Sequence, residues 1–135
     1  MYMSTTFLPV LAAGVANVIL GFIWYHPRVF GGTWMRFLNF SPEMTERGKK
    51  NMPARVLVAF FASIVTASVM QVVGNVFGVY GWTNAMILGA MCWLGFTAPT
   101  MLGMVLWELK PFRYYLIVAG YWLVAFEVTA LILLF

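Results

Sequence analysis

Charge is the scarcest property of this sequence of 135 residues. Charged side chains make up 9% of the chain, against roughly 25% in an average soluble protein. None occurs between Arg55 and Glu108. So few charges could not hydrate the surface of a soluble domain, which excludes an ordinary soluble protein. With 63% hydrophobic residues and a mean hydropathy of +0.89, the chain is predicted to be an integral membrane protein.

Cysteine and histidine are nearly absent as well. The single cysteine, Cys92, excludes a disulfide within the chain and has no nearby basic residue that would activate it as a nucleophile. The single histidine, His26, has no second histidine or neighbouring cysteine to complete a metal site, and no haem attachment motif is present. We therefore expect no catalytic residue, no metal, no cofactor and no enzymatic activity.

Four apolar runs occupy most of the chain, at about residues 7–25, 54–76, 82–107 and 112–135. Each is close to the roughly 20 residues that a helix needs to cross the hydrocarbon layer. A backbone in lipid must satisfy its own hydrogen bonds, so the runs are predicted to be helices. No basic residue precedes the first run, which is therefore expected to remain as a span and not to be removed as a signal peptide. The expected fold is all-α, a single domain over residues 1–135 with four transmembrane helices in a bundle and an interfacial helical segment in the first loop.

The first loop, residues 26–53, is the only sizeable polar region. Its stretch from Trp34 to Phe40 is rich in aromatic residues and is predicted to lie on the membrane surface. The sequence Ser41-Pro42-Glu43 is typical of a helix start, with a serine cap, a proline in the first helical position and an acid in the first turn. This short helix is expected to end between residues 48 and 53.

All eight lysines and arginines lie in two loops. Loop one contains Arg28, Arg36, Arg47, Lys49, Lys50 and Arg55, and loop three contains Lys110 and Arg113. The N-terminal tail and the second loop contain none, so the positive-inside rule places loops one and three in the cytoplasm and both termini outside it. The basic residues are expected to contact anionic lipid headgroups, and no nucleic acid, because no nucleic-acid-binding motif is present. The expected location is a bacterial inner membrane.

One carboxyl lies within an apolar run. Glu127 is eight residues from the end of the sequence, or about 12 Å below that end of a helix. A charge at that depth is costly, so we expect a neutral acid that faces the interior of the protein. Gly120 lies on the same helix face and would let another helix approach. Two roles stay open: a hydrogen bond to a neighbouring helix or subunit, or a proton or cation site on a transport path.

Small and polar residues repeat every four positions in the second run, at Ala59, Ser63, Ala67, Gln71 and Asn75. Such a stripe falls on one face of a helix. Asn17, with small residues four positions before and after it, gives the first run a similar stripe. Small residues allow close packing, and amide side chains provide hydrogen bonds between membrane helices. The stripes predict either helix–helix contacts or the polar lining of a solute path.

The stretch from Gly21 to Trp34, GFIWYHPRVFGGTW, resembles the G-x-x-W-Y-x-P-x-x-F-G-x-x-W signature of a family of small, mainly bacterial membrane proteins of unknown function. Weaker resemblance continues to Gly120-Tyr121 and covers nearly the whole chain. It implies four spans and no assigned activity. The family pattern more often has a small polar residue at the position of His26 and an apolar one at that of Glu127.

The signature also has a physical interpretation as a rigid corner between a span and the membrane surface. The residues that form this corner are Trp24, Tyr25, His26, Pro27, Phe30, Gly31 and Trp34. Trp24 and Tyr25 are expected to anchor the helix end at the interface. Pro27 ends the helix, Gly31 permits a tight bend, and Trp34 returns the chain to the interface.

Four spans in one chain enclose little room for a solute path, so partners are expected. The first hypothesis is a non-enzymatic structural or accessory subunit that acts through helix–helix contacts, in a homo-oligomer or a larger membrane complex. The alternative is a small oligomeric transporter or channel. In that case Asn17, Gln71, Asn75 and Glu127 would line the route, and Glu127 would link the flux to protons.

Overall fold

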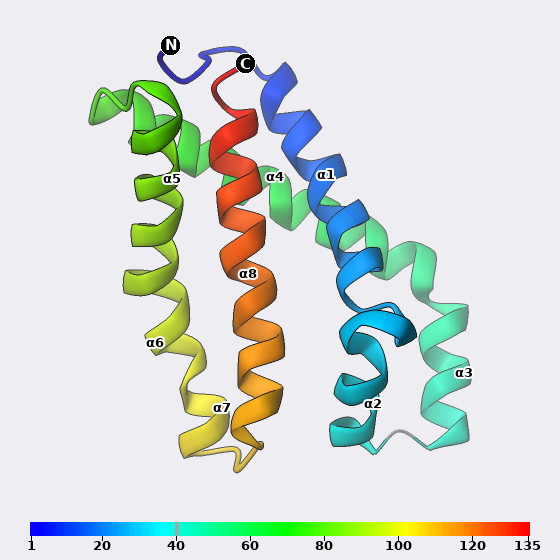
Figure 1. Ribbon diagram of the computed structural model, residues 1–135. Coiled ribbons are helices and arrows are strands. Elements are labelled where there is room, and N and C mark those ends of the chain that lie inside the picture. Colours follow the sequence, from blue (N-terminus) through cyan, green and yellow to red (C-terminus); the bar gives the residue numbers. More distant parts are fainter. Residues whose placement is uncertain (40) are drawn as a thin grey trace.

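The computed structural model describes residues 1–39 and 41–135, which are helical almost throughout (Figure 1). The helices in chain order are α1 (Leu8–Trp24), α2 (Gly32–Leu38), α3 (Pro42–Lys50), α4 (Met52–Val76), α5 (Gly81–Cys92), α6 (Ala98–Met101), α7 (Gly103–Leu106) and α8 (Phe112–Ile132). Two five-residue π-helical segments, Pro27–Gly31 and Trp93–Thr97, join α1 to α2 and α5 to α6. No strand occurs in the described ranges, apart from an isolated bridge between Tyr2 and Tyr80.

Three helical stretches are long and apolar enough to cross a membrane: Met52–Val76, Gly81–Leu106 and Phe112–Ile132. α1 has 17 residues, or about 26 Å at 1.5 Å per residue, which is short of the roughly 30 Å hydrocarbon layer. It reaches the required length only together with Pro27–Leu38, from which it is bent by 43°. The sequence predicts four spans. The structure has three helices of membrane-crossing length, or four if α1 and Pro27–Leu38 are counted as one bent span.

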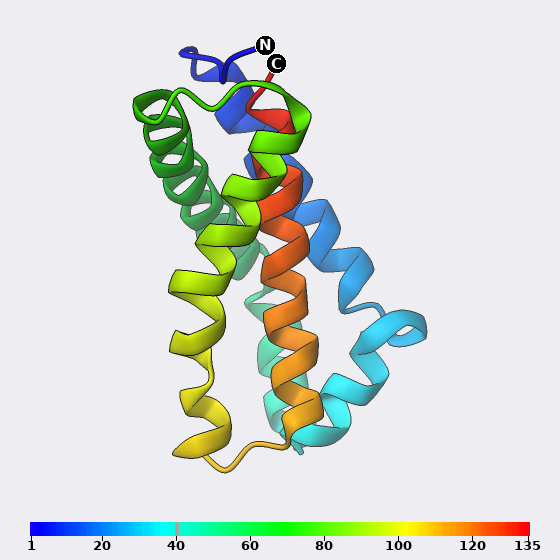
Figure 2. The ribbon, with the colours of Figure 1, turned by 60° about the vertical axis from the view of Figure 1, so that its left-hand side comes forward.

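α8 is the central helix of the array (Figures 1 and 2). It packs against α5 on one side and α1 on the other, and it also contacts α4. Although α4 and α5 are consecutive, they are not among the helix pairs that pack extensively within the described residues. The turn between them contains Gly78 and Gly81 at positive φ and leads α5 to the far side of α8. The helices consequently do not close into the four-helix bundle that the sequence led us to expect.

Small residues let α1 and α4 cross closely. Ala13 and Ala67 have no exposed surface at this crossing. A Cβ on Gly14 would lie 2.9 Å from the ring of Phe60, so only glycine leaves room for that ring without a shift. On the α2–α3 side of this contact, the two helices diverge, and the space between them becomes the cavity described below.

The N-terminal tail ties together the end of the molecule where both termini lie (Figure 1). The amide of Ser4 donates to the carbonyl oxygen of Leu133 at 2.7 Å. Two amide side chains of α4 hold the tail: Gln71 Nε2 donates to the carbonyl of Thr6 at 2.8 Å, and Asn75 Nδ2 to that of Ser4 at 3.1 Å. This clamp was not predicted, since the tail has no hydrophobic periodicity or capping motif of its own.

The short helix predicted in the first loop is confirmed as α3. The hydroxyl of Ser41 accepts a hydrogen bond from the amide of Met44 at 3.2 Å, as expected of the cap, and the helix ends at Lys50. The aromatic stretch before it forms α2, which ends at Asn39 in the left-handed conformation. Phe40, which was expected to belong to that stretch, lies outside the described residues.

The third apolar stretch is continuous but not uniform. Pro99 has no amide hydrogen to donate to the preceding turn, and part of that turn belongs to the π-helical segment Trp93–Thr97. Two hydrogen bonds fasten the irregular part to α8: Trp93 Nε1 donates to the carbonyl of Ala119 at 2.7 Å, and the hydroxyl of Tyr115 in α8 donates to the carbonyl of Ala98 at 2.7 Å.

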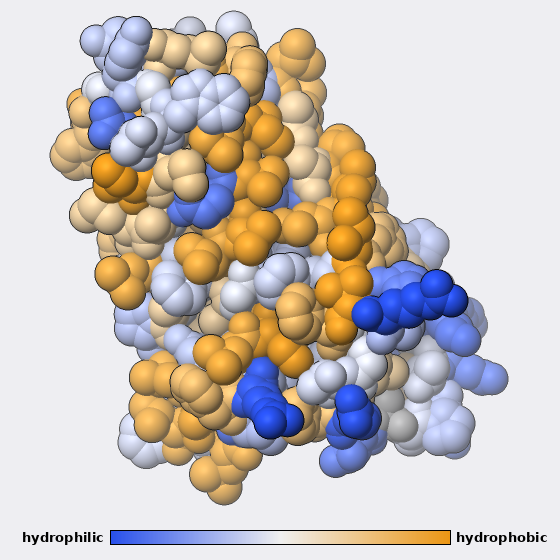
Figure 3. Space-filling view, viewed as in Figure 1, coloured by the Kyte–Doolittle hydropathy of each residue, from blue (hydrophilic) through white to orange (hydrophobic). Residues whose placement is uncertain are grey.

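Hydrophobic side chains cover most of the face in Figure 3, and the largest strongly hydrophilic groups lie in its lower half, at the end that contains α2, α3 and the loop before α8, with smaller ones in the upper left. Many large apolar residues of the long helices are exposed, for example Val65 at 63% and Phe96 at 79%. An exposed apolar surface of this extent suits contact with lipid and not with water.

Candidate functional site

A cavity of about 670 Å³ lies between α1, α4 and α8, where α1 and α4 diverge. Its size falls within the roughly 300–1,000 Å³ of typical ligand pockets. Val18 and Phe22 of α1 and Val56 of α4 contribute apolar walls, and Tyr121 and Trp122 of α8 close the back. Arg55, Met52 and Trp34 line the part of the cavity nearest the first loop. The cavity therefore extends from the basic end of the molecule along the apolar helices.

Asn17 and Ser63 lie at the inner end of the cavity and are both buried. Asn17 Nδ2 donates to the Thr129 hydroxyl at 3.0 Å, and that hydroxyl donates to the carbonyl of Ala125 at 2.7 Å. Because the single hydroxyl hydrogen of Thr129 is used in this way, it is the amide nitrogen and not the oxygen of Asn17 that faces Thr129. Asn17 Oδ1 is buried and has no hydrogen-bond partner in the part of the chain that the structure describes.

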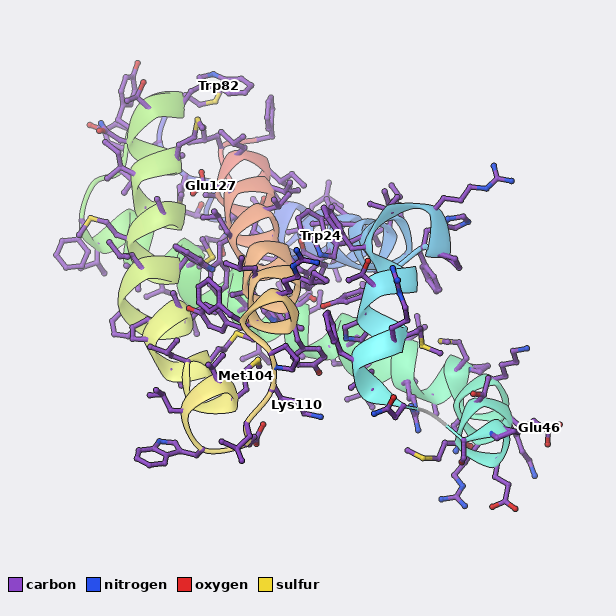
Figure 4. All side chains as sticks on the ribbon, turned by 60° about the horizontal axis from the view of Figure 1, so that its bottom comes forward. Trp24, Glu46, Trp82, Met104, Lys110 and Glu127 are labelled. Carbon is purple, nitrogen blue, oxygen red and sulfur yellow. The ribbon has the colours of Figure 1, made fainter. Side chains whose placement is uncertain are left out.

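The predicted corner surrounds the outer part of the cavity. Trp24 Nε1 donates to the carbonyl of Ile117 in α8 at 2.9 Å (Figure 4). The sequence predicts an interfacial anchor at this position, and the structure shows that the indole also binds α8. The Tyr25 ring packs against those of Trp34 and Tyr121, with centroids 4.9 and 5.6 Å away. The corner is thus an aromatic contact between the end of α1, α2 and α8.

The backbone of the corner is equally close-packed. His26 Nδ1 accepts a hydrogen bond from the amide of Arg28 at 3.1 Å, and the carbonyl of His26 accepts one from Gly31 at 3.0 Å. A Cβ on Gly31 would overlap the carbonyl of Tyr25, so the bend requires glycine. Pro27 begins the π-helical segment, and the ring of Phe30 packs on Trp24 with centroids 4.6 Å apart.

The stripe on α4 divides into three parts. Ala59 and Ser63 line the cavity, and Ala67 lies in the core at the crossing with α1. Gln71 and Asn75 bind the N-terminal tail instead. The stripe therefore makes contacts within the chain, and its polar members do not form one continuous lining.

Glu127 lies on a different side of α8, toward α5 (Figure 4). A Cβ on Gly89 would lie 2.9 Å from Glu127 Oε1, so the carboxyl packs directly on the backbone of α5. Both carboxyl oxygens are buried, and neither has a hydrogen-bond partner among residues 1–39 and 41–135. Gly120 was expected to admit another helix beside Glu127. It lies instead against the ring of Trp24, where a Cβ added to Gly120 would be 3.3 Å from Trp24 Cζ2. Hydrophobic periodicity could not identify Gly89 as the residue that contacts Glu127, because periodicity does not specify which helix packs against each face of α8.

An apolar groove of about 660 Å³ adjoins Glu127 on the outer side of α5 and α8. It is lined by Thr83, Met86, Ile87, Ala90, Leu123, Val124, Glu127, Val128 and Leu131. Glu127 is the only ionisable residue in this lining, and its carboxyl oxygens are buried beneath this nearly apolar surface, against the backbone of α5.

Metal ligands are not assembled anywhere in the described residues, which contain no group of three or more His, Cys, Asp or Glu side chains that could hold an ion. Most side chains around the cavity and the groove are apolar or aromatic, and Arg55 in the cavity and Glu127 in the groove are single charged or ionisable residues among them. Such an arrangement suits the binding of hydrocarbon groups or helices more than acid–base chemistry.

Residues 8–134 match the model of a protein family described as "Protein of unknown function (DUF1761)". Because the match covers nearly the whole chain, the protein belongs to this family. No curated protein and no solved structure matches the chain. The family supplies no activity, so the function is inferred from the geometry above.

Proposed function

We propose that this member of the DUF1761 family is a non-enzymatic structural or accessory subunit of a membrane assembly. In this proposal a helix of a partner chain packs into the groove between α5 and α8 and forms a hydrogen bond with Glu127. The assembly is a homo-oligomer or a larger complex in a bacterial inner membrane. Both termini lie outside the cytoplasm, which agrees with their position at the opposite end from the basic loops (Figures 1 and 3).

The observation that carries the proposal is the buried, unpaired carboxyl of Glu127, which has no partner within the described part of the chain. An unsatisfied buried polar group costs about 1–3 kcal/mol. A helix with a hydroxyl, amide or second carboxyl in the groove would remove that cost. Hydrogen bonds between membrane helices contribute about 0.6 kcal/mol on average and about 1.7 kcal/mol at most. Glu127 would therefore fix the register of a contact whose remaining stability comes from close packing.

The arrangement of the polar residues favours this function over transport. A solute route would require Asn17, Gln71, Asn75 and Glu127 to line one path. Asn17 borders the cavity on the α1 side of α8, whereas Glu127 faces α5, and both amides of α4 are bound to the tail. A transporter built from one chain would thus lack a continuous polar lining.

Native mass spectrometry of protein extracted gently from its own membrane tests the proposal. We expect a fixed stoichiometry, either of copies of this chain or with a second protein. Glu127→Leu should weaken the assembly, whereas Glu127→Gln, which keeps hydrogen-bonding groups, should largely preserve it. Glu108→Gln, which neutralises an exposed loop acid, is the matched control. A monomeric wild-type protein, or an assembly that Glu127→Leu leaves unchanged, would refute the role of the groove.

Reconstituted vesicles separate the transport alternative from this proposal. If the protein carries protons, Glu127→Gln should abolish proton-linked flux while the oligomer persists. If the protein is a structural subunit, the wild type and Glu127→Gln should both show the same background leak. A flux that is present in the wild type and lost in Glu127→Gln would replace the structural proposal with transport.

A further inference from the structure

We infer that the cavity between α1, α4 and α8 is a binding site for one anionic phospholipid. One acyl chain occupies the cavity, and the phosphate lies at Arg55. This site is on the other side of α8 from the proposed partner groove and does not depend on that groove.

The shape of the cavity suits a single chain that lies along α4. Its innermost lining residues are Asn17 and Ser63, α1 and α4 pack closely where Gly14 meets Phe60, and Tyr121 and Trp122 of α8 form one wall. Arg55 and Ser63 both line the cavity and are eight residues apart on α4, which corresponds to a depth of about 12 Å. The outer end lies beside the first loop, at the level where headgroups would meet the basic residues.

The lining selects hydrocarbon over a polar solute. Its walls are mainly aliphatic and aromatic side chains, and the buried polar residues are confined to Asn17 and Ser63 at the inner end. At the outer end the ring of Tyr25 packs against those of Trp34 and Tyr121, a level where tyrosine and tryptophan favour headgroups. The Tyr121 hydroxyl reaches inward and donates to the carbonyl of Asn17 at 3.1 Å. An acyl chain in a bilayer is already surrounded by hydrocarbon. The cavity alone therefore gives little preference for one lipid over another, and the preference has to come from the headgroup.

Arg55 supplies that preference. It belongs to the first turn of α4, lines the cavity and is exposed. Its guanidinium lies beside α3, with Nη1 3.9 Å from the position of a Cβ on Gly48, and can form two parallel hydrogen bonds with a phosphate at that level. The positive end of the α4 dipole lies at the same place and adds to the attraction for an anion. The neighbouring α3 carries three basic residues in its last turn and two acidic residues, Glu43 and Glu46. Because the basic residues outnumber the acidic ones, the electrostatic potential near Arg55 stays positive.

The test is native mass spectrometry after reconstitution into vesicles of equal parts phosphatidylglycerol and phosphatidylcholine. We expect the wild type to retain one phosphatidylglycerol per chain after excess lipid is removed. Arg55→Gln should lower the preference for phosphatidylglycerol roughly tenfold, the value expected for loss of a charge-assisted hydrogen bond. Arg47→Gln removes a basic residue that does not line the cavity and should leave the preference unchanged.

A second test fills the cavity with a larger side chain and asks whether lipid binding is lost. Ala59→Phe places a ring in the cavity and should abolish retention of both lipids, whereas Val58→Phe, on the exposed side of α4, should retain them. A phosphatidylglycerol with a photoreactive group on its acyl chain needs no substitution and should label Phe22, Ala59 or Ala62. Equal retention of the two lipids by the wild type would overturn the inference. So would labelling confined to other surfaces, or a bound free fatty acid in place of the phospholipid.

Discussion

Substitution of Gly31 by alanine tests how closely the corner between α1 and α2 is packed. The added Cβ would overlap the carbonyl oxygen of Tyr25 and lie 2.6 Å from its carbonyl carbon and 2.9 Å from that of His26. Ordinary contact begins at 3.4 Å, so the carbonyl carbon of Tyr25 must move away by about 0.8 Å and its oxygen by more. All three atoms belong to the backbone and cannot turn aside as a side chain would.

Opening the corner also breaks the 3.0 Å hydrogen bond from the Gly31 amide to the carbonyl of His26. Overpacking costs about 1–3 kcal/mol and a lost hydrogen bond about 1 kcal/mol, which gives a destabilisation of about 3 kcal/mol. The assay is the free energy of unfolding from reversible denaturation by dodecyl sulfate in mixed micelles. Gly95→Ala is the control, because its Cβ would meet nothing within 4 Å, and we expect it to change stability by less than about 0.5 kcal/mol. If Gly31→Ala is as stable as Gly95→Ala, the described geometry of the corner is incorrect.

Three further substitutions can be measured in the same assay. Ala67→Leu overpacks a position with no exposed surface and should destabilise the protein by about 1–3 kcal/mol, whereas Val65→Leu, on an exposed position of the same helix, should be nearly neutral. Thr129→Val leaves the Asn17 amide without its acceptor and should cost about 1–2 kcal/mol, and Thr129→Ser should restore most of the loss. Trp24→Phe removes the hydrogen bond to α8 while it keeps an aromatic ring, so a loss of about 0.6–1.7 kcal/mol is expected. No loss would indicate that the indole hydrogen bond does not join α1 to α8.

The helical stretches and the capped helix of the first loop could be predicted because they depend on local signals. Apolar runs of about 20 residues, Pro111 between the last two, and Ser41 before Pro42 each act within a few positions along the chain. The structure places their boundaries close to the expected ones, with α4 at Met52–Val76 and α8 at Phe112–Ile132. Hydropathy did not reveal that α1 falls short of a full span, since the apolar run continues past Trp24 and the bend begins only at Pro27.

The cavity and the Gly89–Glu127 contact depend on how the helices cross, which hydropathy does not specify. The periodicity of α4 placed Ala59, Ser63 and Ala67 on one face, as the structure also has them. It could not show that this face is packed in the core at Ala67 and borders a cavity at Ala59 and Ser63. That difference depends on how α1 and α4 cross. The tail was missed for a related reason, because its partners lie more than sixty residues away.

The two faces of α8 make the two proposals separable. Glu127 and Thr129 are two residues apart, or about 200° around a helix of 3.6 residues per turn, so they face opposite sides. The hydroxyl of Thr129 accepts a hydrogen bond from Asn17 of α1 and donates one to the carbonyl of Ala125, whereas the carboxyl of Glu127 has no partner in the described chain. A partner helix on the α5 side and a lipid on the α1 side would therefore bind without competing. Glu127→Leu should weaken the assembly and leave lipid retention unchanged. Arg55→Gln should lower the preference for phosphatidylglycerol and leave the assembly intact in the same mass spectra. If either substitution abolished both, the cavity and the groove would be energetically coupled through α8, and independent sites would be the wrong description.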